Sequence, residues 1–204
     1  MSTLEVGKIV PATGTAITLG DSGDTFTIPA SATLDVNGTI DVAGATLTGS
    51  FGKVLQVIGV TKADTFSHNT TSWVDITDMT VSITPAATSS KIYVTSSIAC
   101  GQRGYTSYMW IKLVRDSTDV FVGDAAGSRN QVTVSGGMGD DYSQMTQAAI
   151  SYIDSPNTTS ATTYKLQMKC QNTDAQYINR SYVDTDSAVY SRAASSIIVM
   201  EIGA

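Results

Sequence analysis

From residue 53 onward, apolar and polar residues alternate in short runs. Within residues 108–113 and again within residues 165–170, every second residue is apolar. In an extended chain, successive side chains point to opposite faces, so this period of two predicts strands with one buried and one solvated face. The strands predicted from such runs are 54–60, 72–76, 80–84, 91–99, 107–115, 120–123, 131–135, 148–154, 163–170, 176–179 and 195–202.

Turn-forming residues separate these runs. Examples are Thr84-Pro85-Ala86, the stretch 115–119, Ser135-Gly136-Gly137 and the stretch 154–157. Eight to ten short strands at this spacing favour two packed sheets. The prediction for residues 53–204 is therefore a head domain with a jelly-roll-like β-sandwich.

The last predicted strand has a different pattern. Ile198, Met200 and Ile202 occupy one face, and Ile197 and Val199 occupy the other. A strand that is apolar on both faces is expected to be buried on both, and in a small sandwich the second burial can be a contact between subunits. Ile197 and Val199 are the candidate trimer contacts.

Residues 1–52 carry shorter apolar pairs, such as Ile17/Leu19 and Ile40/Val42, between glycines and prolines. Strands of three or four residues are too short to form a sheet with its own core. They become stable when they stack along an axis or intertwine with copies from other chains. We expect a short repetitive β shaft, solenoid-like or an intertwined trimer; the alternative is a flexible Gly/Thr linker.

Composition supports this division and narrows the class of protein. All nine tyrosines and all five arginines follow residue 92, and Lys8 is the only basic residue before Lys53. A chain poor in Glu, Lys and Arg and rich in Thr, Val and Ile disfavours helical folds. The net charge of −6, with no Lys/Arg cluster, argues against nucleic-acid binding. The N-terminus lacks the pattern of a signal peptide, and no apolar run is long enough to insert into a membrane.

Catalytic side chains are scarce. His68 is the single histidine, and the two glutamates, Glu5 and Glu201, lie near opposite ends of the chain. A Ser-His-Asp or Cys-His arrangement would have to use His68, which is more simply a surface residue of a polar stretch. No spacing typical of a zinc, calcium or phosphate site is present. We therefore expect no enzymatic activity, no metal and no cofactor.

The two cysteines, Cys100 and Cys170, each fall near the end of a predicted strand. They could lie side by side in the sandwich. Two buried reduced thiols are the favoured interpretation for a chain made in a reducing cytosol.

Recognition chemistry is better supplied. Tyrosine and arginine recur together in predicted loops, and both residue types are enriched in binding interfaces. They also suit sugars, because a ring can stack and a guanidinium can bind hydroxyls. These residues are candidates for either receptor contact or subunit contact: Arg103, Tyr105, Tyr108, Tyr177, Arg180, Tyr182, Tyr190 and Arg192.

Several segments resemble the fibres of tailed bacteriophages, marine phages especially. Val6-Gly7-Lys8-Ile9, Phe26-Thr27-Ile28-Pro29 and residues 37–46 resemble their repetitive shafts. Residues 81–92 and 195–202 resemble the beginning and end of their C-terminal sandwich domains. The resemblance implies a homotrimer that is assembled in the host cytoplasm, is fixed to the virion by its N-terminal region, and carries a distal knob.

The expected function is thus that of a virion structural protein, a short trimeric tail fibre or spike used in host attachment. Its partners would be itself, other virion proteins and a carbohydrate or protein of the host surface. A capsid decoration, cement or head-fibre protein is the first alternative. A carbohydrate-active enzyme that relies on aspartates and a cellular lectin or adhesin are the others.

Overall fold

The computed structural model describes residues 53–102, 107–135 and 143–203, together with Thr25, Thr27 and Asn37. The predicted shaft and attachment segment, residues 1–52, thus lies outside the described residues apart from these three positions. The chain divides into two units between Thr48 and Gly49, and the fold below is that of the second unit.

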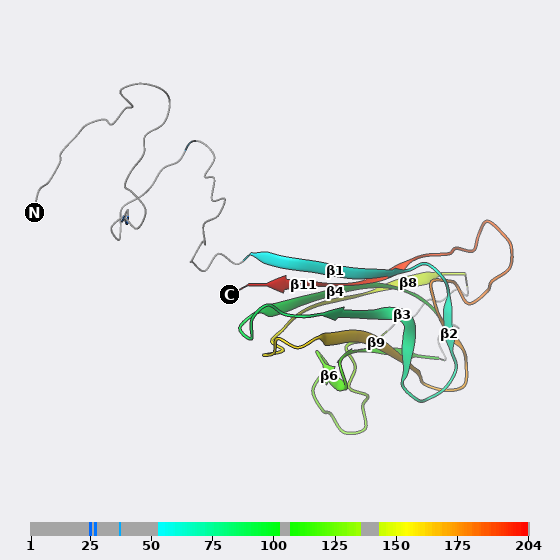
Figure 1. Cartoon of the computed structure of the whole chain (residues 1–204). Coiled ribbons are helices and arrows are strands. Elements are labelled where there is room, and N and C mark those ends of the chain that lie inside the picture. The colour runs from blue at the N-terminus through cyan, green and yellow to red at the C-terminus, as the bar shows by residue number, and fades with distance from the viewer. Residues whose placement is uncertain are drawn as a thin grey trace, which may run out of the picture. The chain divides into compact units, whose positions relative to one another are not determined.

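The described part of this unit contains strands and no helix (Figure 1). The prediction of an all-β head is confirmed. The strands are β1 (Val54–Lys62), β2 (Phe66–His68), β3 (Val74–Ile83), β4 (Lys91–Gly101), β5 (Met109–Arg115), β6 (Thr118–Val120), β7 (Val134–Ser135), β8 (Met145–Asp154), β9 (Thr162–Cys170), β10 (Gln176–Ile178) and β11 (Ser195–Ile202).

The strands form two antiparallel sheets with the strand order of a jelly roll. The first sheet runs β1-β11-β4-β8, and the short strands β10 and β2 extend it beside the end of β4. The second sheet runs β3-β9-β5, and β6 and β7 both pair with the free edge of β5. The short strands β2, β7 and β10 are additions to a set of eight strands. When these eight are renumbered 1 to 8 in chain order, the first sheet has the order 1-8-3-6 and the second has the order 2-7-4-5. Two interleaved Greek keys give this order, so the jelly-roll prediction is confirmed.

The core lies between the two sheets and follows the predicted alternation. On β9, Leu166, Met168 and Cys170 are fully buried, and the residues between them are only partly buried. Met109, Ile111 and Leu113 of β5 are also fully buried. Burial of these apolar side chains is the main source of stability of the sandwich.

The structure corrects the assignment of Ile197 and Val199. Both side chains are completely buried in the core of their own chain. Since side chains alternate along β11, the partly exposed face of this strand belongs to Ile198, Met200 and Ile202. Ile197 and Val199 therefore pack against the opposite sheet and are not subunit contacts.

Two local predictions also differ from the structure. The two strands predicted in residues 72–84 form one strand, β3, with an irregular register between Asp75 and Thr80 and a positive φ of 61° at Asp78. The polar stretch around His68 was not predicted as a strand, yet Phe66–His68 forms β2 by pairing with β10. That pairing joins segments more than a hundred residues apart and leaves no local pattern.

The direction of the strands defines two ends of the sandwich. We call the end at which β1 begins and β11 ends the near end, and the opposite end the far end. At the near end, Val54 of β1 pairs with Ile202 of β11. At the far end, β4 ends at Gly101 and β11 begins at Ser195 (Figure 1). The connection 179–194, which carries Arg180, Tyr182, Tyr190 and Arg192, belongs to the far end, as does Tyr108 directly before β5.

Candidate binding site at the far end of the sandwich

The structure brings most of the predicted Tyr and Arg residues into one segment. Tyr177 lies on β10, and Arg180, Tyr182, Tyr190 and Arg192 lie on the connection from β10 to β11. We call residues 177–192 the Tyr/Arg segment. Arg103 and Tyr105 lie outside the described residues.

Asn179 anchors this segment to the sandwich. It is fully buried, with a positive φ of 65°, a conformation that asparagine tolerates better than most residues. Its side-chain amide donates hydrogen bonds to the carbonyl oxygens of Lys62 and Asp64 at 2.8 and 2.9 Å. Its side-chain oxygen accepts a 2.6 Å bond from the Ser195 hydroxyl, which also accepts one from the backbone N–H of Ala99. The segment is thus tied to β1, β4 and β11 at one point.

A glycine allows the next residue to approach β4 closely. A Cβ atom at Gly101 would lie 1.9 Å from the carbonyl oxygen of Arg180. No side chain fits in that space, so only glycine permits this contact between the two backbones. Gly101 therefore determines how closely the backbone of the Tyr/Arg segment approaches β4.

Arg180 holds the first part of the segment together. Its guanidinium lies 3.6 Å from the ring centre of Tyr177, in the geometry of a cation–π contact. It also donates to the carbonyl oxygens of Ser181 and Tyr182, at 3.4 and 3.2 Å. The rings of Tyr177 and Tyr182 meet edge to face, with centroids 5.8 Å apart. Only 17% of the Arg180 side chain is exposed, so this arginine works mainly as an internal brace.

Asp184 connects the two ends of the segment. Its carboxylate lies 3.4 Å from the Arg180 guanidinium and 2.6 Å from that of Arg192. The backbones of Arg180 and Arg192 also form an isolated antiparallel bridge. Residues 181–191 are consequently held as a closed loop.

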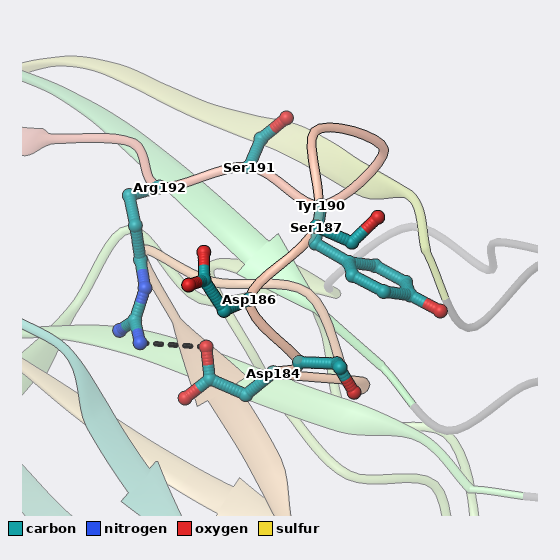
Figure 2. A pocket seen from close by; sticks show the side chains of 7 residues that line it. Asp184, Asp186, Ser187, Tyr190, Ser191 and Arg192 are labelled. Atoms are coloured by element: carbon teal, nitrogen blue, oxygen red, sulfur yellow. Dashed lines mark ion pairs between the residues drawn. The ribbon is translucent and has the colours of Figure 1, made fainter.

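Residues of this loop line an open cleft with a volume of about 250 Å³ (Figure 2). Its lining is polar apart from one aromatic ring. The lining residues are Asp184, Thr185, Asp186, Ser187, Tyr190, Ser191 and Arg192. Of the predicted residues, Tyr190 and Arg192 line this cleft, and the side chain of Arg192 is 58% exposed.

Tyr108 lies elsewhere at the same end. It directly precedes β5, and its carbonyl oxygen accepts a 3.0 Å bond from the N–H of Gln171 after β9. The neighbouring Ser107 hydroxyl donates to the side-chain oxygen of Asn172 at 2.8 Å. Tyr108 is therefore positioned by the second sheet, whereas the Tyr/Arg segment is held by the first.

Residue type and spacing in the sequence pointed to the arginine and tyrosine of the cleft but not to its acids. Asp184 and Asp186 stand in a polar stretch that resembles any surface loop. Asn179 was placed at the end of a strand, but its anchoring role depends on partners at residues 62–64 and 195. Nothing local in the sequence indicates such contacts.

A second aromatic cluster lies on the outer face of the second sheet. The Lys112 ammonium lies 4.6 Å from the ring centre of Trp73, and that of Lys169 lies 5.8 Å from Trp73 and 5.6 Å from Trp110. Lys169 also donates to the side-chain oxygen of Asn130. The cations cover the ring faces, so this cluster joins neighbouring strands. The placement of Trp110 among the polar residues of an alternating strand was the signal for it.

The other candidate groups have structural surroundings. His68 ends β2, and its Nε2 lies 3.0 Å from both the carbonyl oxygen of Ser72 and the hydroxyl of Thr70. Cys100 and Cys170 are free and buried. Burial raises the pKa of the Cys100 thiol to about 12 and that of Cys170 to about 11, so both stay protonated and unreactive at neutral pH.

The described residues form neither a metal site nor a membrane-spanning helix. They contain no group of three or more His, Cys, Asp or Glu side chains placed to hold a metal ion. In the same ranges, no helix has the length and apolar character needed to cross a membrane.

Comparisons with known proteins identify no family. No family model and no curated protein match the sequence. Two solved structures that the chain resembles are described as those of infectious bursal disease virus. The Gx strain gives a TM-score of 0.39 at 11% identity, and the Gt strain gives 0.36 at 15%. The matches cover 72% and 73% of this chain and 38% of each viral chain. Likeness at these TM-scores carries no argument, so the fold assignment rests on the strand order.

Proposed function

We propose that this chain is a virion structural protein, a short trimeric fibre or spike of a tailed phage whose head contacts the host surface without a catalytic step. The observation that carries the proposal is the position of the Tyr/Arg segment. It lies at the far end of the sandwich, opposite the end at which β1 begins at Val54. This polarity suits a protein that is fixed at one end and binds at the other.

The segment is also ordered before it meets a partner. Asn179, Gly101 and Asp184 hold it by the contacts described above, so little conformational entropy remains to be lost on binding. Tyrosine and arginine then offer large contact surfaces and several donors. Both properties favour recognition.

The outer face of the first sheet supports a trimer. Val57 and Ile153 are 57% and 63% exposed there, and Ile198, Met200 and Ile202 lie between them, partly exposed. The strands β1, β11, β4 and β8 place no charged side chain on this face except Lys91 at its near end. We call this uncharged surface the apolar face after its exposed residues on β1, β11 and β8; on β4, the outward residues after Lys91 are Tyr93, Thr95 and Ser97.

The outer face of the second sheet is different. It carries the ion pairs Lys165–Asp75 and Lys112–Asp119, both at 2.8 Å. The difference in charge between the two faces favours the apolar face as the contact surface between subunits. Four strands of about eight residues span roughly 500 Å² in projection. Identical copies around a three-fold axis are the occupants we propose.

Labelled antibodies against the head test the function directly. They should bind the tips of fibres or spikes on purified particles and should block adsorption to the host. Particles that carry no label, or label without any effect on adsorption, would contradict a role in attachment.

One observation favours the alternative of a capsid decoration or head-fibre protein. The contacts of Arg180 lie within the Tyr/Arg segment itself, which gives this part of the segment a structural role. In that case the antibody would label the capsid surface, and adsorption would not change.

A further inference from the structure

We propose that the cleft lined by Asp184, Asp186, Tyr190 and Arg192 binds a neutral sugar ring of a glycan. This inference rests on the proposed attachment function and deepens it, since it names a ligand class and the residues that would bind it. In the view of Figure 2, the carboxylate of Asp186 lies between the guanidinium of Arg192 and the ring of Tyr190.

Contacts between the two ends of the loop hold the cleft in shape. The bridge between Arg180 and Arg192 and the two ion pairs of Asp184 hold its base. The backbone N–H of Tyr190 donates a 3.1 Å bond to the carbonyl oxygen of Ser187, which forms the turn at the other side. This turn holds the backbone of Tyr190 beside the cleft.

The lining matches the groups of a sugar. Within the described part of the chain, no hydrogen bond or ion pair uses the carboxylate of Asp186, so its two oxygens can accept bonds from two neighbouring hydroxyls. The Arg192 guanidinium donates to ring or hydroxyl oxygens. The half-buried ring of Tyr190 provides the flat apolar surface on which the C–H groups of a sugar can pack.

The charges select against ionic ligands. Two carboxylates, Asp184 and Asp186, are balanced by two guanidiniums, Arg180 and Arg192. A phosphate, sulfate or sugar acid would meet the unpaired carboxylate of Asp186. An amino sugar with a free ammonium would meet the exposed charge of Arg192. A ligand with hydroxyl groups and no net charge can bind both the carboxylate of Asp186 and the guanidinium of Arg192 without repulsion.

The volume limits the ligand to one ring. The cleft, at about 250 Å³, is smaller than the range of about 300–1,000 Å³ typical of pockets that enclose a drug-sized molecule. A single ring in an open cleft binds weakly. Several copies on one fibre would raise the overall strength through effective concentration.

Saturation-transfer NMR on the full chain tests the inference. The probes are D-glucose, D-galactose, D-mannose and L-rhamnose, with D-glucuronate and D-glucosamine as the charged comparisons. At least one neutral sugar should receive saturation, and more strongly than either charged sugar. In Asp186→Asn and in Tyr190→Ala, the signal should fall about tenfold, because each removes a main contact.

Two variants serve as matched controls. Asp124→Asn removes an exposed carboxylate of another loop and should leave the signal unchanged, and Tyr190→Phe keeps the ring and should retain most of it. No saturation of any of the four neutral sugars, a stronger signal from glucuronate, or a signal that survives both test variants would overturn the inference. Antibody labelling at fibre tips is independent of these outcomes, so failure of the sugar site is distinguishable from failure of the proposed function.

Discussion

Two single residues at the far end determine how the Tyr/Arg segment is attached to the sandwich. Gly101 admits the backbone of Arg180, and Asn179 ties the same segment to three strands. These residues are small or polar and contribute little to the core. Their effect comes from the one conformation or contact that each permits.

Gly101→Ala is expected to destabilise the head by about 1–3 kcal/mol, because the new methyl group overlaps the carbonyl oxygen of Arg180 and the backbone must shift. Urea unfolding measures the change. Gly123→Ala is the matched control, since a Cβ atom at Gly123 meets nothing within 4 Å. Equal stability of the two variants would show that the close approach at Gly101 does not matter.

Tyr164→Phe is expected to cost about 1–3 kcal/mol. The Tyr164 hydroxyl is buried and donates a 2.7 Å bond to Asp154, a buried carboxylate that also pairs with Arg115 at 2.8 Å. Removal of the donor leaves part of this carboxylate without a partner. Tyr93→Phe, at a partly exposed hydroxyl that bonds Ser151, should change the unfolding free energy much less. A larger loss at Tyr93 than at Tyr164 would contradict this account.

At the scale of elements, contacts between distant segments hold the near end of the sandwich together. Glu201 on β11 is fully buried. It accepts hydrogen bonds from the Gln56 side chain on β1, at 2.5 Å, and from the backbone N–H of Ala86 between β3 and β4, at 2.7 Å. One carboxylate therefore joins three parts of the chain.

This contact predicts a pH dependence of stability. Burial opposes the charge of Glu201, but hydrogen bonding from Gln56, Ser90 and the backbone of Ala86 together outweighs it, so the pKa of Glu201 is lowered from its ordinary value. A lowered pKa in the folded state means that the carboxylate stabilises the fold above its unfolded pKa. This contribution is lost as the pH falls through the folded pKa.

Urea unfolding between pH 7 and pH 3 measures the effect. Glu201→Gln should be less stable than the natural chain at pH 7, and the difference should shrink toward pH 3. A difference that stays constant over this range would rule out the proposed linkage.

The elements that sequence patterns predicted are those whose burial repeats every second residue. Leu166, Met168 and Cys170 defined β9, and β5 was found in the same way. The pattern on β11 was also visible, but it does not say which of its two apolar faces meets the opposite sheet. That choice depends on the pairing of β11 with β1 and β4, so Ile197 and Val199 were assigned to the wrong side.

The candidate site was predictable in part for a similar reason. Tyr177, Arg180, Tyr182, Tyr190 and Arg192 stood out by residue type and spacing. The attachment of this segment to the sandwich depends on contacts of Asn179 and Gly101 that join parts of the chain remote in sequence. The acids of the cleft lacked any distinguishing pattern, so the ion pairs with Asp184 were found only in the structure.

At the scale of the whole molecule, the apolar face is expected to mediate self-association. Met200→Glu should weaken the trimer with little change in the fold of each subunit, because a charge buried in an interface without a partner is costly. Val199→Glu should instead unfold the subunit, since Val199 lies in the core. Sedimentation equilibrium together with circular dichroism distinguishes the two outcomes.

The control for these variants lies on the other sheet. Thr80→Glu places the same charge on the exposed outer face of β3 and should leave both mass and fold unchanged. A natural chain that sediments at 21.4 kDa at micromolar concentration, as a folded monomer, would contradict the trimer. Equal loss of mass in Met200→Glu and Thr80→Glu would contradict the apolar face as the site of contact.

The central place of β11 has a consequence for synthesis. β11 lies between β1 and β4, and Met200 pairs with Val57, which the ribosome makes more than a hundred residues earlier. Until β11 emerges, β1 lacks the only strand with which it pairs in the described sheet, and one edge of β4 is open. The head would therefore stay incomplete until β11 has been made, and until then it would depend on protection of these edges from aggregation. Since β11 also supplies the middle of the apolar face, this face is complete only after β11 has paired with β1 and β4.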